Sequence, residues 1–423
     1  MKQVHKFGGA SIASAEQLIQ TASIIEQLPQ REQCTVIVSA RGKTTNALEE
    51  ILHLYLQRDS LALTKLEELK RDHLHWIQSI FSGGVPSELD DTINNLFVEI
   101  EWAIEDEPRD DYGFEYDQIV SMGELISSAV LSGYLRARGV PHALVDARDW
   151  LKTDNRYRNA RILWPETMQA ASQFLRADHL IISQGFIGCT SENFTTTLGR
   201  EGSDYTAAIA AKCLEASGVT VWKDVPGIMT ADPKQNPDAS FISHLNYREA
   251  IELAYYGAKV IHPKTLHPLI ETKIPLTVRS FVQPELSGTT IDATEATPPE
   301  SIIQKEGQFL VSLRKNTLGF VDDAMLTQVL TELQELGLES RMLHQSAVTL
   351  SIVMNDPGPQ KEHLLNRLRK TYRVTYNENL ELITIRHGGS ETLAKWSEKP
   401  GVLLEQATRD TFQILLKPTP SRE

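Results

Sequence analysis

Strand-like apolar runs alternate with amphipathic helical stretches along most of this chain, and this alternation limits its fold more than any other feature. Gln3–Phe7 precedes the helical periodicity of Ser14–Gln27, and Thr35–Ser39 is a β-branched run typical of a strand buried on both faces. His142–Asp146 and His179–Gln184 continue the series. We therefore expect an α/β fold whose central sheet is mostly parallel and sandwiched by helices.

The pattern changes around Ser287–Pro299, a polar stretch with prolines and few large apolar residues, where we expect a domain boundary. Before it, Leu61–Ala103 and Gln118–Arg138 are expected to be helical. After it, shorter elements predict two small α+β units, with strands at Phe309–Leu313, Ser346–Met354, Tyr372–Tyr376, Leu380–Arg386 and Thr411–Leu416. The expected domains are residues 1–292 and residues 300–423, the second being a regulatory or dimerising module.

Charge and cysteine content restrict the possible ligands. The 423 residues carry a net charge of −14, which argues against binding to nucleic acid or to an anionic membrane. An anionic substrate would therefore need a local cluster of cations. Cys34, Cys189 and Cys213 match neither a disulfide framework nor a zinc-binding spacing. No secretory segment or bilayer-spanning run is recognisable, so we expect a cytoplasmic protein.

The stretch Thr195–Ala211 combines the groups that bind anions. Gly199 and Arg200 lie in a turn, and Ser203 and Asp204 then open an alanine-rich run that should be helical. Helix N-termini attract anions through their N–H groups and dipole. The same residues also fit an ordinary capped helix start, with Ser203 or Asp204 as the cap.

Two other turns carry cations and glycines. Lys6 ends the first predicted strand beside Gly8 and Gly9, and Lys259 lies in a Gly-Ala-Lys turn. Open α/β sheets bind ligands at the carboxyl ends of their strands. Together with Arg200, these cations favour phosphoryl transfer from a nucleotide, because the protein mainly positions and neutralises the transferred group.

Each of these residues also has a simpler structural explanation. Lys6 could be a water-exposed lysine at a strand end, and Asp204 a first-turn acid favoured by the helix dipole. Glu124 could pair with an arginine, and Lys259 could be a cation at a helix C-terminus. His262, which precedes a proline, is expected to be structural rather than catalytic.

Several motifs, taken in order, resemble those of aspartate kinases in the amino acid kinase superfamily. They are KFGGAS, SMGELISS, QGFIG, TTTLGREGSDYTAA, DVPGIMTADP and GAKVIHPKTL, and they fall within residues 2–291. The resemblance implies the amino acid kinase fold, MgATP as phosphoryl donor and L-aspartate as acceptor. The product would be 4-phospho-L-aspartate, on the route to lysine, threonine and methionine. Since the acceptor is a carboxylate, no general base is required.

The expected roles divide between the two substrates. Lys6 is expected to contact the γ-phosphate and Lys259 the ATP phosphates, while Asp204 orients these lysines or helps to hold Mg²⁺, which binds mainly through ATP. The resemblance implies that Arg200 clamps the α-carboxylate of aspartate and that Glu124 takes its ammonium group. Thr45, Phe186 and Ser203 would complete the aspartate site; the remaining ATP-binding residues would be Gly8, Gly9, Lys223, Asp224, Met229 and Lys234.

Four residues depart from the family pattern. Ala10 stands where a threonine is usual, Glu201 where glycine is frequent, and Met229 and Lys234 where tyrosine and arginine are usual. A carboxylate at Glu201 could repel aspartate unless it points away. The C-terminal part resembles paired ACT domains, although Gln345–Val348 differs from effector-binding relatives. We therefore expect a homodimer with weakened or altered feedback by lysine or threonine.

Two other functions fit part of the pattern. Another member of the superfamily would phosphorylate glutamate, acetylglutamate or a nucleoside monophosphate on the same sheet. A silent amino-acid-sensing or scaffold protein could keep the fold without the chemistry, and Ala10 and Glu201 are the residues that favour this alternative. Lys6, Arg200, Asp204 and Lys259 oppose it.

Overall fold

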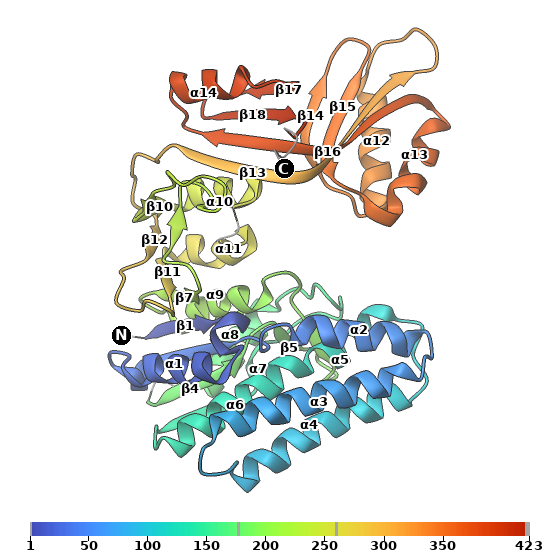
Figure 1. Ribbon diagram of the computed structural model, residues 1–423. Helices are drawn as coiled ribbons and strands as arrows, with labels where there is room; N and C mark the ends of the chain where they lie inside the picture. The colour runs from blue at the N-terminus through green and yellow to red at the C-terminus, as the bar shows by residue number, and fades with distance from the viewer. Residues whose placement is uncertain (1, 176–177, 259–260, 419–423) are drawn as a thin grey trace. The chain divides into compact units, whose positions relative to one another are not determined.

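The computed structural model describes residues 2–175, 178–258 and 261–418, which form two compact units (Figure 1). Among the described residues, unit 1 comprises 2–175, 178–228, 241–251 and 261–296. Unit 2 comprises 229–240, 252–258 and 297–418. Two segments, 229–240 and 252–258, therefore belong to unit 2 although they precede the domain boundary expected at Ser287–Pro299.

Unit 1 is built on an eight-stranded sheet in the order β10-β12-β11-β7-β1-β2-β4-β3. All neighbours are parallel except β11 and β12. The strands are β1 (Gln3–Phe7), β2 (Cys34–Val38), β3 (His142–Val145), β4 (Leu180–Gln184), β7 (Val219–Lys223), β10 (His244–Asn246), β11 (Leu276–Ser280) and β12 (Thr289–Asp292). This confirms the predicted α/β class.

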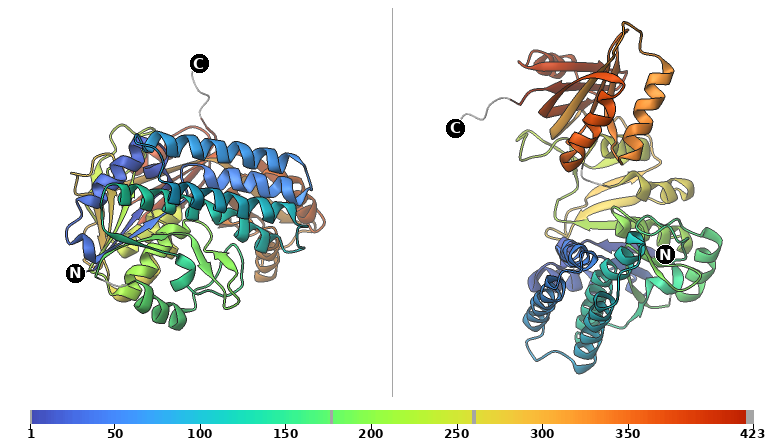
Figure 2. Two further views of the ribbon diagram at one scale, coloured as in Figure 1. Left: turned by 90° about the horizontal axis from the view of Figure 1, so that it is seen from below. Right: turned by 90° about the vertical axis from the view of Figure 1, so that its right-hand side faces the viewer.

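Helices cover both faces of this sheet. Side chains alternate along a strand, so Phe7 enters the apolar core formed with the helices of one face, whereas Lys6 points to α9 on the other. The helices are α1 (Ala15–Glu26), α2 (Thr44–Leu56), α3 (Leu61–Ile80), α4 (Ser87–Glu105), α5 (Tyr112–Val120), α6 (Met122–Ala137), α7 (Ala147–Trp150), α8 (Trp164–Phe174), α9 (Gly202–Leu214), α10 (Tyr247–Tyr256) and α11 (Pro263–Thr272). The long helices α3 and α4 run side by side (Figure 2).

One sequence prediction in unit 1 needs correction, and one strand was not predicted. The helix expected at Gln118–Arg138 is two helices, α5 and α6, which meet at Ser121. The break places Glu124 in the first turn of α6. The polar stretch after Ser287 contains β12, in which Thr289 and Ile291 are buried because β12 pairs with both β10 and β11. Neighbouring strands, rather than local composition, decide its structure.

Unit 2 contains one six-stranded antiparallel sheet in the order β14-β15-β13-β16-β18-β17. Its elements are β13 (Ser301–Lys315), α12 (Asp323–Glu335), β14 (Ser340–Gln345), β15 (Leu350–Asn355), α13 (Lys361–Arg369), β16 (Tyr372–Arg386), α14 (Ser390–Ser397), β17 (Val402–Ala407) and β18 (Thr411–Leu416). The two strands expected at Tyr372–Tyr376 and Leu380–Arg386 are one strand, β16. The strands β13 and β16 are long enough to pair in both of the α+β halves expected from the sequence. The two halves of unit 2 therefore share a single sheet.

Short elements complete the fold. Single turns of 3₁₀ helix lie at Gly9–Ile12, Arg31–Gln33 and Gly358–Gln360, and two-stranded sheets join β5 (Ile187–Cys189) to β6 (Thr195–Thr197) and β8 (Ile228–Met229) to β9 (Phe241–Ile242). None of the described helices combines the length and the apolar character that crossing a bilayer requires.

Candidate active site

A buried ion pair joins the end of β1 to the first turn of α9. The Nζ atom of Lys6 lies 2.6 Å from Oδ1 of Asp204, and Nζ of Lys223 lies 3.5 Å from Oδ2. Lys6 is only 8% exposed and Asp204 only 2%. Burial raises the pKa of Asp204, but the charges and hydrogen bonds of Lys6 and Lys223 outweigh burial and hold the pKa below its usual range. Asp204 is therefore an ionised carboxylate that holds two lysines at the carboxyl ends of neighbouring strands β1 and β7.

The turn after β1 brings bare backbone close to these cations. A Cβ atom on Gly8 would lie 3.3 Å from Nζ of Lys6, and one on Gly9 would lie 2.6 Å from the carbonyl oxygen of Ala40. A side chain at Gly9 would thus push the β1 turn away from the β2 turn. Glycines in this position leave room for an anion to approach the backbone N–H groups and the lysine together. The residues present therefore fit a nucleotide phosphate.

Glu124 is the second buried acid, and its environment differs from that of Asp204. Its Oε1 accepts a hydrogen bond of 3.1 Å from the N–H of Ala40. Burial raises its pKa to about 8, although the Ala40 bond and the charge of Lys6 oppose the shift. Within the described part of the chain, its Oε2 has no hydrogen-bond partner. A buried acceptor of this kind is suited to a cationic group supplied by a ligand.

The end of β4 packs directly against the start of α9. A Cβ atom on Gly185 would lie 2.5 Å from Cβ of Ser203, and one on Gly202 would lie 2.7 Å from the ring of Phe186. Phe186 has a positive φ of 68°, and its N–H donates to Oγ1 of Thr206 at 3.0 Å. Two of the residues predicted for the aspartate site, Phe186 and Ser203, are thus held side by side.

The neighbours of Thr45 and Glu124 in the sequence make a second close approach. Thr45 occupies the first turn of α2, whose first residue, Thr44, would be 3.2 Å from a Cβ atom placed on Gly123. Thr44 in turn contacts His73 of α3, with 3.2 Å between Oγ1 and Nε2. The N-termini of α2 and α6 therefore meet where the aspartate site is predicted.

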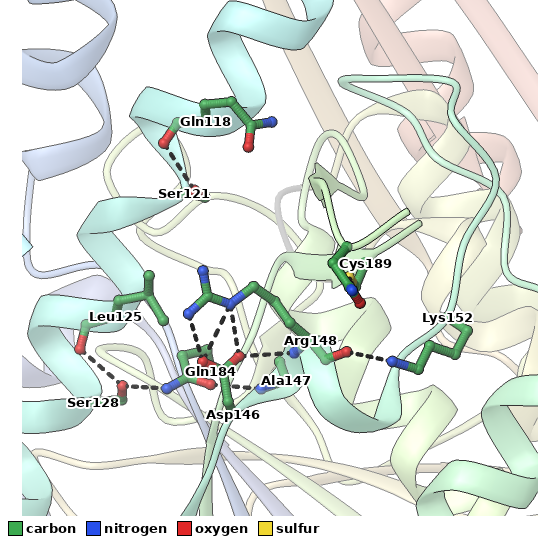
Figure 3. A network of polar contacts seen from close by, with 11 residues as sticks. Gln118, Ser121, Leu125, Ser128, Asp146, Ala147, Arg148, Lys152, Gln184 and Cys189 are labelled. Atoms are coloured by element: carbon green, nitrogen blue, oxygen red, sulfur yellow. Dashed lines mark hydrogen bonds and ion pairs between the residues drawn. The ribbon is translucent and has the colours of Figure 1, made fainter. Parts of the chain in front are cut away.

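A polar network surrounds Gln184, the last residue of β4 (Figure 3). The side-chain amide of Gln184 donates to Oγ of Ser128 and accepts from the N–H of Ala147, both at 2.8 Å. Next to it, Arg148 pairs with Asp146 at 2.7 Å. The sequence offered no signal for Gln184 beyond its place before the Gly-Phe pair.

Within the described part of unit 1, two predicted residues, Arg200 and Asp224, are exposed. The Arg200 side chain is exposed, and in the described part of the chain it makes no hydrogen bond or ion pair. Asp224 is exposed in the turn after β7. Met229 and Lys234 belong to unit 2, where Lys234 is exposed. Lys259 lies outside the described residues.

Two residues without a predicted role hold the turn that carries Arg200. Nζ of Lys264 donates to the carbonyl oxygen of Leu198 at 2.9 Å and to Oδ1 of Asn159 at 2.8 Å. Oε2 of Glu201 accepts from the N–H of His262 at 2.8 Å. The carboxylate of Glu201 is therefore engaged with α11. The motif GAKVIHPKTL was the available signal for Lys264.

Comparison with known proteins agrees with this arrangement. Residues 1–280 match the model of the amino acid kinase family, so the chain belongs to that family. Within it, lysine-sensitive aspartokinase 3 of Escherichia coli (strain K12) is 30% identical over 399 residues, covering 90% of this chain and 86% of that protein. The chain thus belongs to the aspartokinases. A bifunctional aspartokinase/homoserine dehydrogenase of Haemophilus influenzae is 34% identical over 301 residues, but this chain spans only 36% of it.

Known structures give the same result over nearly the full chain. E. coli aspartokinase III in complex with lysine and aspartate aligns with a TM-score of 0.83 at 28% identity, covering 98% of this chain and 96% of that one. Its complex with aspartate and ADP aligns with a TM-score of 0.82 at 28% identity, covering 99% and 96%. The amino acid kinase fold predicted for the chain is confirmed.

Proposed function

We propose that this chain is an aspartate kinase, which transfers the γ-phosphoryl group of ATP to the side-chain carboxylate of L-aspartate. The product, 4-phospho-L-aspartate, feeds the synthesis of lysine, threonine and methionine. The observation that carries the proposal is the buried pair of Lys6 and Asp204, joined by half-buried Lys223, at the carboxyl ends of β1 and β7. Membership of the aspartokinases supports the choice of acceptor.

The nucleotide side of the reaction depends on cations and bare backbone. Lys6 contacts the γ-phosphoryl group, Lys223 and Lys259 neutralise the other phosphates, and the turn at Gly8 and Gly9 supplies N–H donors. Asp204 keeps Lys6 and Lys223 in place. When present, Mg²⁺ would be held mainly through the phosphates of ATP and would screen the phosphate charge that repels the acceptor. Asp224, Met229 and Lys234 complete the nucleotide site in this proposal.

The aspartate side holds both charged groups of the α-carbon. Oε2 of Glu124 accepts the α-ammonium group, and Arg200 binds the α-carboxylate as a bidentate pair. Thr45, Phe186 and Ser203 enclose the rest of the substrate. The acceptor carboxylate is left facing Lys6.

The chemical step then needs no proton transfer. A side-chain oxygen of aspartate forms a bond to the γ-phosphorus, while the bond from that phosphorus to the bridging oxygen breaks and its electron pair leaves with ADP. Charge on the transferred group is greatest in the transition state, which is where a preorganised Lys6 contributes most.

Unit 2 is assigned a regulatory and dimerising role. Unit 2 combines helices with one antiparallel sheet, as expected of paired ACT domains. The E. coli relative has been seen in complex with lysine. We propose a homodimer whose response to lysine or threonine is weakened or altered. A cytoplasmic location stays a prediction from the sequence.

A panel of acceptors tests the proposed function. Purified chain is incubated with MgATP, hydroxylamine and one of aspartate, glutamate, acetylglutamate or UMP, and hydroxamate and ADP are measured. Aspartate should give ATP-dependent hydroxamate and the other acceptors little product. ADP formation with UMP or acetylglutamate instead would identify another family member, and no turnover with any acceptor would indicate the silent scaffold.

Replacement of Arg200 by alanine tests the aspartate clamp. The variant should raise the KM for aspartate by roughly 100-fold, as expected for loss of a bidentate charged pair, and leave the KM for ATP almost unchanged. Steady-state kinetics with each substrate varied in turn measures both values. Equal effects on the two constants would contradict the clamp.

A further inference from the structure

The turn that carries Arg200 is tied to α11 by the side chain of its neighbour. Glu201 adopts left-handed backbone angles, with φ 52° and ψ 30°. This region disfavours a residue with a Cβ atom, and glycine would enter it freely. The side chain therefore has to contribute something that glycine cannot.

That contribution is a hydrogen bond to the residue that begins α11. Oε2 of Glu201 accepts the N–H of His262 at 2.8 Å, and His262 is the N-cap of α11. The next residue, Pro263, has no N–H, so the His262 N–H is the first donor at this helix end. A carboxylate is well placed there because it also faces the positive end of the helix dipole.

A second bond crosses between the same two segments. Nζ of Lys264, in the first turn of α11, donates to the carbonyl oxygen of Leu198 at 2.9 Å. Burial lowers the pKa of Lys264, so the amine is partly withdrawn from water while it holds the turn. One bond thus holds each end of the turn Leu198–Glu201, and Arg200 lies between them.

We propose that Glu201 is a positioning residue, whose carboxylate fastens the turn Leu198–Glu201 to α11 and so fixes where Arg200 presents its guanidinium. The inference rests on the proposed function, in which Arg200 binds aspartate. It assigns a role to a residue that departs from the family pattern. Its carboxylate orients the substrate clamp instead of repelling the substrate.

The test compares three substitutions of Glu201 with a matched control on the same helix. Glu201→Ala and Glu201→Gly remove the acceptor, and the glycine variant also relieves the backbone. Glu201→Gln keeps an oxygen that can accept from His262. Glu215→Gly is the control, because Glu215 also has a left-handed φ of 51° at the other end of α9 but is exposed.

Kinetics and amide exchange are the two measurements. The alanine and glycine variants should each raise the KM for aspartate about tenfold with kcat little changed, which is the loss expected for one charged hydrogen bond. Hydrogen exchange should accelerate in peptides covering 198–205 and 261–267. Glu201→Gln and Glu215→Gly should resemble the wild type in both measurements, and melting temperatures should stay close throughout.

Three results would overturn the proposal. The first is a glycine variant whose KM for aspartate matches that of Glu215→Gly. The second is a glutamine variant as impaired as alanine, and the third is a uniform loss of kcat and melting temperature. The hydroxamate assay of the wild type distinguishes failure of the Glu201 proposal from failure of the proposed aspartate kinase function. A wild type without hydroxamate formation would remove the aspartate kinase assignment, and amide exchange would still decide whether Glu201 holds the turn.

Discussion

The pKa values of two buried carboxyl groups in the candidate site are shifted in opposite directions. Lys6 and Lys223 overcome the effect of burial at Asp204 and lower its pKa, whereas burial dominates at Glu124 and raises its pKa to about 8. Asp204 therefore keeps a fixed negative charge near neutral pH. Near neutral pH Glu124 is largely protonated in the free site, and it becomes fully charged when a cation such as the α-ammonium of aspartate binds.

This difference predicts the pH dependence of aspartate binding. Below pH 8 the free enzyme holds a proton on Glu124 that must leave before the ammonium group can pair with the carboxylate. The affinity for aspartate should therefore rise with pH between about 6 and 8, by up to tenfold per unit, and level off above. Calorimetric titration in buffers of different ionisation enthalpy measures the affinity and the released proton.

Glu124→Gln supplies the control for this prediction. The variant should bind aspartate more weakly and lose the dependence on pH. A wild-type affinity that is constant from pH 6 to pH 8, or a glutamine variant that keeps the slope, would contradict the role of Glu124.

Removal of the Lys6 cation should affect both rate and stability. Lys6→Met should lower kcat at least about 100-fold, as for loss of one preorganised donor. It should also reduce the free energy of unfolding by about 3 kcal/mol, because Asp204 stays buried with less compensation. Turnover and urea denaturation measure the two effects.

Two further variants separate the causes. Adding Asp204→Asn to Lys6→Met should recover stability without recovering kcat. Lys370→Met removes an exposed lysine of unit 2 and should change neither property. Full activity in Lys6→Met would place phosphoryl transfer elsewhere.

At the scale of elements, the site depends on how closely β4 approaches α9. Gly185 leaves no space for a methyl group, since its Cβ atom would meet Cβ, Oγ and Cα of Ser203 at 2.5 to 2.8 Å. Gly185→Ala should destabilise unit 1 by about 1–3 kcal/mol and lower activity through displacement of Phe186 and Ser203. Gly83→Ala is the control, because nothing lies within 4 Å of its Cβ position. Equal melting temperatures and activities for the two variants would show that the contact does not position the site.

The sequence predicted those elements whose periodicity agrees with their packing. Ser14 caps α1 through a capping box, and Cys34–Val38 is buried throughout, as its β-branched composition indicates. The break at Ser121 was missed, and so was the strand β12, which forms because it pairs with β10 and β11. The site residues that the motifs indicate stay a prediction, whereas the contact of Lys223 with Asp204 arises from the pairing of β1 with β7 and could not be seen locally.

At the scale of the whole molecule, unit 2 carries an exposed apolar patch made of Leu318, Phe320 and Val348. Leu318 is 101% and Phe320 74% exposed, and the N–H of Val321 donates to the carbonyl oxygen of Ala347 at 3.0 Å, which holds the two loops together. A patch of this kind on a small unit indicates contact with another chain. We expect it to contribute to the proposed homodimer.

Phe320→Glu should weaken that dimer about tenfold or more, because a charge would be buried where an aromatic anchor is needed. Sedimentation velocity over a range of concentrations measures the dissociation constant. Trp102→Glu is the matched control, as Trp102 is 65% exposed on unit 1. A dimer unchanged by Phe320→Glu, or disrupted equally by Trp102→Glu, would place the interface elsewhere.

Phosphoryl transfer at the Lys6–Asp204 cluster is tested most directly by a crystal structure with L-aspartate and a non-hydrolysable ATP analogue. The expected result is a γ-phosphate oxygen about 3 Å from Nζ of Lys6, with the ammonium group of aspartate on Glu124. A γ-phosphate bound away from Lys6, or aspartate bound without contact to Glu124, would contradict the proposed site.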